Sequence, residues 1–219
     1  MLVVRRGALG MDAERGPRGA QWSPAMGIKC ISKAAIIGAA AISAGAQADI
    51  VFQDNFNGEN EGSGSLNYSG FLRWSVEDGT VDLIGNGYFD FYPGNGLYVD
   101  LDGSTGQPGM IYTTLELSAG TYRLEFDLGG STRGESNLVG VIAGSSMETY
   151  NVASSDPLTR RALDFTSTGD GPVMIGFRND GWDNMGAILD NVTVSTLVPA
   201  PGSAMLAGVG VLCLARRRR

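Results

Sequence analysis

The clearest pattern of apolar and polar positions lies in residues 121–128, Thr-Tyr-Arg-Leu-Glu-Phe-Asp-Leu. Tyr122, Leu124, Phe126 and Leu128 fall on one side of an extended chain, and the charged residues between them fall on the other. Alternation of this kind is typical of a β-strand with one face in a core and one face toward water. The segment therefore predicts a half-buried strand.

Similar short runs continue through the rest of residues 49–197, separated by Gly, Asp and Asn at spacings of about ten residues. They predict further strands at 50–56, 71–76, 80–84, 87–92, 97–101, 110–117, 138–143, 150–153, 161–165, 173–178 and 187–194. The turn-forming Ser-Ala-Gly at 118–120 predicts a hairpin that joins 110–117 to 121–128. We expect one all-β domain of about 150 residues, a β-sandwich.

Composition removes several classes of chemistry. The chain has no histidine, which excludes Ser-His-Asp and Cys-His catalysis and imidazole-ligated zinc. Its two cysteines, Cys30 and Cys213, form no Cys-x-x-Cys motif, so a thiolate metal site or redox pair is excluded as well. Neither cysteine lies in the strand-rich body, whose core therefore has no disulfide.

Charge divides the chain into a basic front, an acidic body and a basic end. Residues 49–215 hold 21 acidic residues, six arginines and no lysine, a net charge of −15 within a total of −7. Such a body repels phosphate backbones, so nucleic-acid binding is excluded. The carboxylates are read either as a solvating surface or as a surface that collects cations.

The first 48 residues contain an export signal. Residues 26–33 form a short cationic segment, an apolar run occupies 34–44, and Ala46 and Ala48 form an Ala-x-Ala cleavage site. This order is that of a secretory signal peptide over 26–48, which is handed to the export machinery and removed by signal peptidase. Residues 1–25 resemble no targeting pattern and are interpreted as a misassigned start, with Met26 as the true one, or as a disordered extension.

Residues 198–219 have the features of a second targeting segment. Pro199, Ala200 and Pro201 precede an apolar run that ends at residue 215, and the chain closes on four arginines, Arg216, Arg217, Arg218 and Arg219. The fourteen residues of 202–215 would span only about 21 Å as a helix, against a hydrocarbon layer of about 30 Å. We expect a short membrane-inserted helix with the arginines on the cytoplasmic side, rather than a buried helix of the folded body.

This ending resembles the PEP-CTERM sorting signal of exported bacterial proteins, which has a Pro-x-Pro motif, a short apolar segment and a terminal arginine cluster. The resemblance implies that the chain is the substrate of an exosortase, which processes the tail and delivers the body to the cell envelope, cell surface or extracellular matrix. The sequence departs from the pattern at Ala200, where glutamate usually stands.

The body is similar to the galactose-binding-like jelly rolls of carbohydrate-binding modules. Four stretches carry the similarity: 52–56, 96–103, 117–126 and 184–192. In such folds the first and last strands often share a structural Ca²⁺, which implies Asp54 and Asp190 as ligands, joined by Asn57 or Glu59. Carboxylate oxygens suit this hard cation. The alternative for Asp190 is an aspartate that caps a turn at a strand end.

Candidate ligand-binding residues lie in the loop 179–184. There Trp182 stands among Asp180, Asp183 and Asn184, as a ring that stacks on a sugar with hydrogen-bonding neighbours would. A second aromatic group could do the same and comprises Tyr88, Phe89, Phe91 and Tyr92. The alternative is that Trp182 covers one end of the sandwich and that the second group belongs to the core.

Three functions remain open. The first is a non-catalytic surface or matrix protein, sorted by its tail, whose β-sandwich binds polysaccharide. The second is a purely structural matrix protein without a ligand. The third is a glycoside hydrolase, because two carboxylates suffice for that reaction, although no pair stands out in the sequence and a lone sandwich offers little room for a cleft. The first is the hypothesis we carry forward.

Overall fold

The computed structural model describes residues 48–197. Residues 1–47, with the predicted extension and most of the predicted signal peptide, and residues 198–219, with the predicted sorting signal, lie outside the described residues, and the predictions made for them stay predictions. Ala48, at the predicted cleavage site, is exposed. No helix within residues 48–197 is long and apolar enough to cross a membrane.

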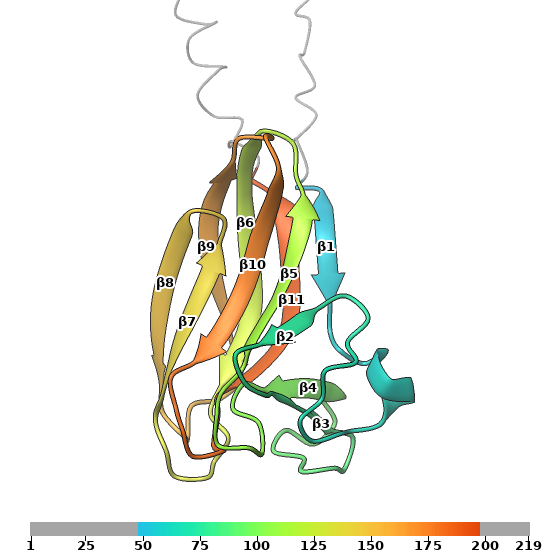
Figure 1. Cartoon of the computed structure of the whole chain (residues 1–219), viewed down its shortest axis with the longest axis vertical. Helices are drawn as coiled ribbons and strands as arrows, with labels where there is room; N and C mark the ends of the chain where they lie inside the picture. The colour runs from blue at the N-terminus through green and yellow to red at the C-terminus, as the bar shows by residue number, and fades with distance from the viewer. Residues whose placement is uncertain (1–47, 198–219) are drawn as a thin grey trace, which may run out of the picture. The chain divides into compact units, whose positions relative to one another are not determined.

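Two antiparallel sheets face each other (Figure 1), which confirms the predicted β-sandwich. The first sheet, sheet A, contains β3 (Asp82–Gly85), β4 (Leu97–Asp100), β11 (Ile188–Thr196), β6 (Gly120–Gly129) and β9 (Thr159–Ser167), with β1 (Ile50–Asp54) also paired to β11. Sheet B contains β2 (Ser75–Glu77), β5 (Met110–Glu116), β10 (Pro172–Asn179), β7 (Asn137–Ala143) and β8 (Ser146–Val152). A 3-10 turn, η1 (Glu59–Gly62), lies between β1 and β2.

The core lies between the sheets and is built by alternating side chains. On β6, Tyr122, Leu124, Phe126 and Leu128 are buried, as their spacing predicts. Phe126 meets Phe177 of sheet B edge to face, with ring centroids 5.1 Å apart. Interleaving of the two inner faces in this way is what holds a β-sandwich together.

Strands β3 and β4 are buried on both faces. Leu83 and Val99 join the core between the sheets, whereas Ile84 and Tyr98 form a second cluster with Ile188 on the outer face of sheet A. This second cluster exists because the connection between β3 and β4, residues 86–96, folds over that face. A strand buried on both faces reads as a continuous apolar run rather than an alternating one, as Leu97-Tyr-Val does.

The first and last strands run side by side, as the resemblance implied. β1 pairs with β11 in antiparallel register, with Asp54 opposite Val192. The N–H of Thr196, the last residue of β11, donates to the carbonyl of Asp49, just before β1, at 2.9 Å. The two ends of the folded body therefore meet at one point.

Two predictions about local structure are wrong. Strand 110–117 and strand 121–128 do not form a hairpin, because β5 pairs within sheet B and β6 within sheet A. The turn at 118–120 instead carries the chain from one sheet to the other, which alternation alone cannot distinguish from a hairpin. The predicted strand at 87–92 is part of the loop over sheet A, where Phe89 has a positive φ of 45°.

Trp74 is buried, as predicted, although it precedes β2 (Ser75–Glu77), which overlaps the predicted strand 71–76 only at its last two residues. Its indole N–H donates to Asp54 Oδ2 at 3.0 Å, and its ring meets Phe52 edge to face. Trp74 thus fixes β1 against the core.

Replacing Trp74 with phenylalanine should lower the free energy of unfolding by about 2–3 kcal/mol, because it removes the donor to Asp54 and leaves a small void. Urea denaturation measures this. The matched control is Trp182→Phe, at a side chain that is 65% exposed, which should stay within about 0.5 kcal/mol of the native protein. Equal losses in both variants would contradict the role given to Trp74.

Candidate functional site

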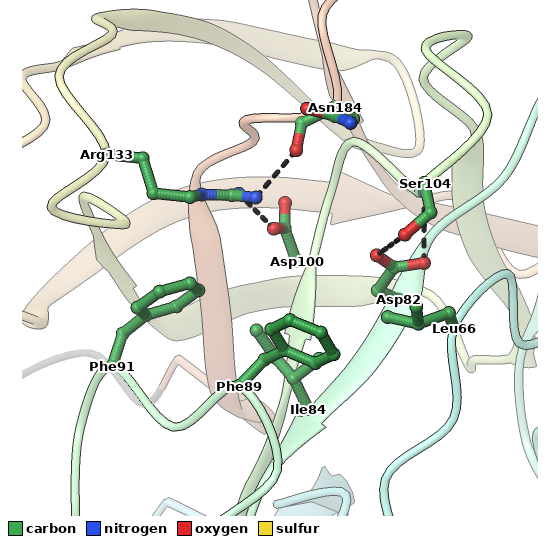
Figure 2. Close-up of a pocket in the computed structure, with 9 residues that line it drawn as sticks. All are labelled: Leu66, Asp82, Ile84, Phe89, Phe91, Asp100, Ser104, Arg133 and Asn184. Carbon is green, nitrogen blue, oxygen red and sulfur yellow. Dashed lines mark hydrogen bonds and ion pairs between the residues drawn. The ribbon is translucent and has the colours of Figure 1, made fainter.

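A pocket of about 260 Å³ opens beside the second cluster, over β3 and β4 (Figure 2). Its walls come from five connections and from the two strands themselves. The lining residues are Leu66, Asp82, Ile84, Phe89, Phe91, Asp100, Ser104, Arg133 and Asn184. In Figure 2, Phe89 and Phe91 stand on one side, Arg133 and Asn184 on another, and Asp100 between them.

The loop 86–96, which carries the aromatic wall, is held by the hydroxyl group of Tyr98. This oxygen accepts the N–H groups of Phe91 at 2.6 Å and Tyr92 at 3.0 Å, and donates its proton to Asp90 Oδ1 at 2.9 Å. Tyr98 has no exposed surface, and its burial raises the pKa of the phenol far above its usual range. A buried hydroxyl requires partners, and here the loop supplies all of them.

Two further contacts fix the far end of this loop. The Asn95 amide donates to Asp190 Oδ2 at 2.5 Å, and the Tyr92 hydroxyl donates to the Gly130 carbonyl at 2.6 Å. At the base of the loop Gly85 has φ of 113°, and a Cβ there would lie 2.1 Å from the Gly96 carbonyl oxygen. Only glycine allows the two ends of the loop to approach this closely.

Phe89 stands at the mouth of the pocket with 56% of its surface exposed. Its ring meets Tyr88 edge to face at 4.9 Å, and its backbone is in the left-handed region. An aromatic residue in that conformation is a strained outlier, and such strain gathers at functional sites. Behind it Phe91 is half-buried, with the Arg133 guanidinium 5.1 Å from its ring centroid.

Two buried carboxylates form the floor. Asp82 of β3 and Asp100 of β4 are directly opposite each other in the antiparallel pair, so their side chains share one face. Asp82 accepts the Asn67 N–H at 2.6 Å and both the N–H and the hydroxyl of Ser104. Asp100 accepts the Asp102 N–H at 3.1 Å and forms an ion pair with Arg133.

Arg133 links the floor to the opposite wall. It lies in the connection between β6 and β7, and its guanidinium also donates to the Asn184 carbonyl at 2.6 Å. Both terminal nitrogens are therefore engaged within the protein. The arginine holds two connections together rather than presenting a free positive charge.

Burial raises the pKa of Asp100 to about 7, because removing the carboxylate from water outweighs the attraction of Arg133. The negative charge of Asp82 also raises it. The floor of the pocket is therefore rich in hydrogen-bond acceptors and only partly charged near neutral pH.

The candidate ligand-binding residues of loop 179–184 do not lie at one site. Asn184 lines the pocket, but Trp182 does not, and its ring is exposed. Asp183 turns back on its own chain and accepts the Met185 N–H at 3.1 Å. Asp180 borders a different hollow, beside Leu138. In the second predicted group, Phe89 and Phe91 line the pocket, whereas Tyr92 is part of the second cluster.

The two residues implied as Ca²⁺ ligands have different neighbours. Asp54 accepts the N–H groups of Phe56 and Trp74, and its charge adds to burial in raising the pKa of Glu59. Asp190 instead accepts Asn95 and Asn191 and lies opposite Asp127. Within residues 48–197 no three Asp, Glu or Cys side chains are grouped to hold a metal ion. A shared Ca²⁺ stays a prediction, and most of its six to eight oxygens would have to come from backbone and water.

Sequence reasoning missed the floor of the pocket and its arginine. The pattern Asp100-x-Asp102-Gly103 indicates only a turn, and Asp82 looks like an ordinary strand residue. Arg133 is one of only six arginines in an acidic body and lies in a Gly- and Ser-rich stretch. An isolated basic residue in such a loop could have indicated a partner among the carboxylates. The residues that line this pocket come from connections far apart in the chain, so they form no motif of fixed spacing that the sequence could show.

No protein-family model and no curated protein matches the sequence. Solved structures similar to the chain include the CBM22-1 and GH10 modules of a Clostridium thermocellum endo-1,4-β-D-xylanase 10B with xylohexaose (15% identity, TM-score 0.46, 70% of this chain and 30% of that one). Others are a CBM61 module with β-1,4-galactotriose (17%, 0.45, 65% and 94%) and the K3 cleaved adhesin domain of Lys-gingipain from Porphyromonas gingivalis (17%, 0.47, 68% and 99%). At these identities, the ligand of this chain has to be argued from its own residues.

The raised pKa of Asp100 predicts a pH-dependent stability difference. An unfolded aspartate has a pKa of about 3.9, so the folded state holds the proton more tightly. The stability from this group is fully present below about pH 4 and is lost as pH rises through about 7. Relative to Asp100→Asn, the native protein should lose up to about 4 kcal/mol between pH 4 and pH 8, by urea denaturation.

Asp164→Asn is the control of opposite sign. The exposed Arg123 ion pair lowers the pKa of Asp164, so its contribution is present above about pH 4 and falls in acid. A native protein that gains stability over Asp100→Asn as pH rises would show that the Arg133 ion pair outweighs burial.

Proposed function

We propose that this chain is an exported cell-surface or matrix protein whose β-sandwich binds polysaccharide without cleaving it, in the pocket over β3 and β4. The observation that carries the proposal is an exposed aromatic ring, Phe89, fixed at the mouth of a pocket whose floor consists of hydrogen-bond acceptors. Sugar rings offer an apolar C–H face and a rim of hydroxyl groups, so they need both kinds of surface.

The wall and floor match these two needs. Phe89 presents a ring that a sugar can stack on, and Phe91 extends the apolar wall inward. Asp82 and Asp100 offer carboxylate oxygens to hydroxyl donors. The loop under Phe89 is held by Tyr98, Asn95 and Tyr92, so little conformational entropy would be lost on binding.

The glycoside hydrolase remains the second candidate, because Asp82 and Asp100 lie on neighbouring strands and the pKa of Asp100 is raised to about 7. A pair of close carboxyl groups with one raised pKa is what a retaining enzyme uses. Both groups, however, are nearly inaccessible, and all four of their oxygens accept hydrogen bonds from the chain itself. Carboxyl groups engaged in this way are poorly placed to attack a sugar or to protonate a leaving group, which argues against cleavage.

We also propose that an exosortase processes the tail and so sorts the protein to the envelope or matrix. The support is the order of Pro-x-Pro, apolar run and arginine cluster in 198–219. The hydrogen bond between Asp49 and Thr196 also supports this proposal, because the first and last strands of the folded body are already paired up to the residue where the tail begins. Removal of the signal peptide and the tail would then leave the sandwich intact.

Replacing Phe89 with alanine should weaken binding of the recognised glycan by about tenfold or more, because the stacking ring is lost. A glycan array identifies the ligand, and calorimetry measures the affinity. Leu72→Ala is the matched control, because its apolar side chain is 77% exposed and does not line the pocket.

Trp182→Ala separates the pocket from the loop 179–184. A loss of binding in Trp182→Ala but not in Phe89→Ala would place the site on that loop. Absence of binding to every glycan would favour the purely structural matrix protein, and release of reducing sugar from the array glycans would favour the hydrolase.

Mass spectrometry of the mature protein from fractionated cells should find its first residue near Asp49 and its last near Pro199. The body should be in the envelope or matrix fraction. Deleting residues 216–219 should leave it with an unprocessed tail. An unprocessed product in the cytosol, still carrying residues 26–48 and 198–219, would contradict both export and sorting.

A further inference from the structure

We infer that the pocket holds a single uncharged sugar ring at the end of a glycan chain, and that it rejects uronic acids. This inference rests on the proposed function and names the ligand class for the same site. It follows from three features of the pocket: its volume, the charges of its walls and the direction of its hydrogen bonds.

The volume allows one ring. At about 260 Å³ the pocket is smaller than the roughly 300–1,000 Å³ typical of sites for drug-sized ligands. Its walls come from separate connections that close around the floor, with Ser104 and Leu66 on one side and Arg133 and Phe91 on the other (Figure 2). A polysaccharide that ran through the site would need a groove open at both ends. The geometry instead suits the last ring of a chain.

The charges exclude an acidic ring. Asp82 and Asp100 line the pocket, and the only cationic side chain in its lining within residues 48–197 is Arg133. That guanidinium is already bound to the Asp100 carboxylate and the Asn184 carbonyl. A ligand carboxylate would therefore meet two buried acids, of which Asp100 is only partly ionised near neutral pH, and no free cation, inside a body of net charge −15. Like charges in a site shielded from water repel strongly.

The polar groups of the pocket require a ligand that donates hydrogen bonds. Asp82 Oδ1 already accepts two N–H groups, from Asn67 and Ser104. Asp82 Oδ2, the two Asp100 oxygens and the Asn184 carbonyl each accept one bond within the protein and keep a lone pair. The Ser104 hydroxyl spends its proton on Asp82 Oδ2 at 2.7 Å, so it too faces a ligand as an acceptor. Sugar hydroxyl groups are donors that satisfy such a wall, whereas a carboxylate has no proton to give.

Calorimetry on the full chain tests this inference with matched probes. The probes are the methyl glycosides of glucose, galactose, xylose and mannose, their oligomers of two to six rings, and glucuronic and galacturonic acid. The two uronic acids are used as methyl glycosides as well, so that they differ from the glucose and galactose probes only at the sixth carbon. Phe89→Ala and Leu72→Ala are measured with the same panel.

We expect at least one neutral sugar to bind with an affinity that changes by less than about threefold between one ring and six. Its uronic acid counterpart should bind at least about tenfold more weakly. An affinity that climbs tenfold or more along the series, or a uronic acid that binds equally well, would overturn the inference and leave glycan binding intact. Absence of binding across the whole panel, or binding indifferent to Phe89→Ala, would overturn the proposed pocket itself.

Discussion

The hydroxyl group of Tyr98 has to find its hydrogen-bond partners inside the protein, and the shape of the pocket follows from how it does so. Tyr98 sits on β4, a strand buried on both faces, so water cannot serve it. The loop 86–96 brings the N–H groups of Phe91 and Tyr92 and the carboxylate of Asp90 to it. These three residues directly follow Phe89 in the chain. The hydrogen bonds to the Tyr98 hydroxyl group therefore also position the exposed Phe89 ring.

Electrostatics connects this loop to the rest of the sandwich. Asp82 and Asp100 face each other across two strands, where like charges are unfavourable. Backbone N–H groups and Ser104 stabilise Asp82, while Arg133 reaches Asp100 from the connection between β6 and β7. The arginine also contacts the Phe91 ring and the Asn184 carbonyl. One ion pair thus joins the aromatic loop, the strand pair and the connection before β11.

How much could be predicted from the sequence depended on whether a feature was local. Alternation along β6 was enough to predict its buried face, and the apolar run at Leu97–Asp100 indicated a strand. Alternation could not tell which sheet a strand joins, so the link from β5 to β6 was misread as a hairpin. At 87–92, a segment rich in aromatic residues, which strands favour, was interpreted as a strand, but it is a loop in which Phe91 and Tyr92 pack on the second cluster and Phe89 is exposed. The floor of the pocket was missed because its partners come from connections far apart in the chain.

Neither cysteine lies in residues 48–197, so no disulfide within these residues can stiffen the domain. The loop that carries Phe89 is instead held at both ends by side chains of sheet A: Tyr98 of β4 and Asp190 of β11. Asp190 is buried at a strand end, and the Asn95 amide is one of its hydrogen-bond partners. The position of this loop on the sheet therefore depends on hydrogen bonds to two strands, β4 and β11, that are far apart in the sequence.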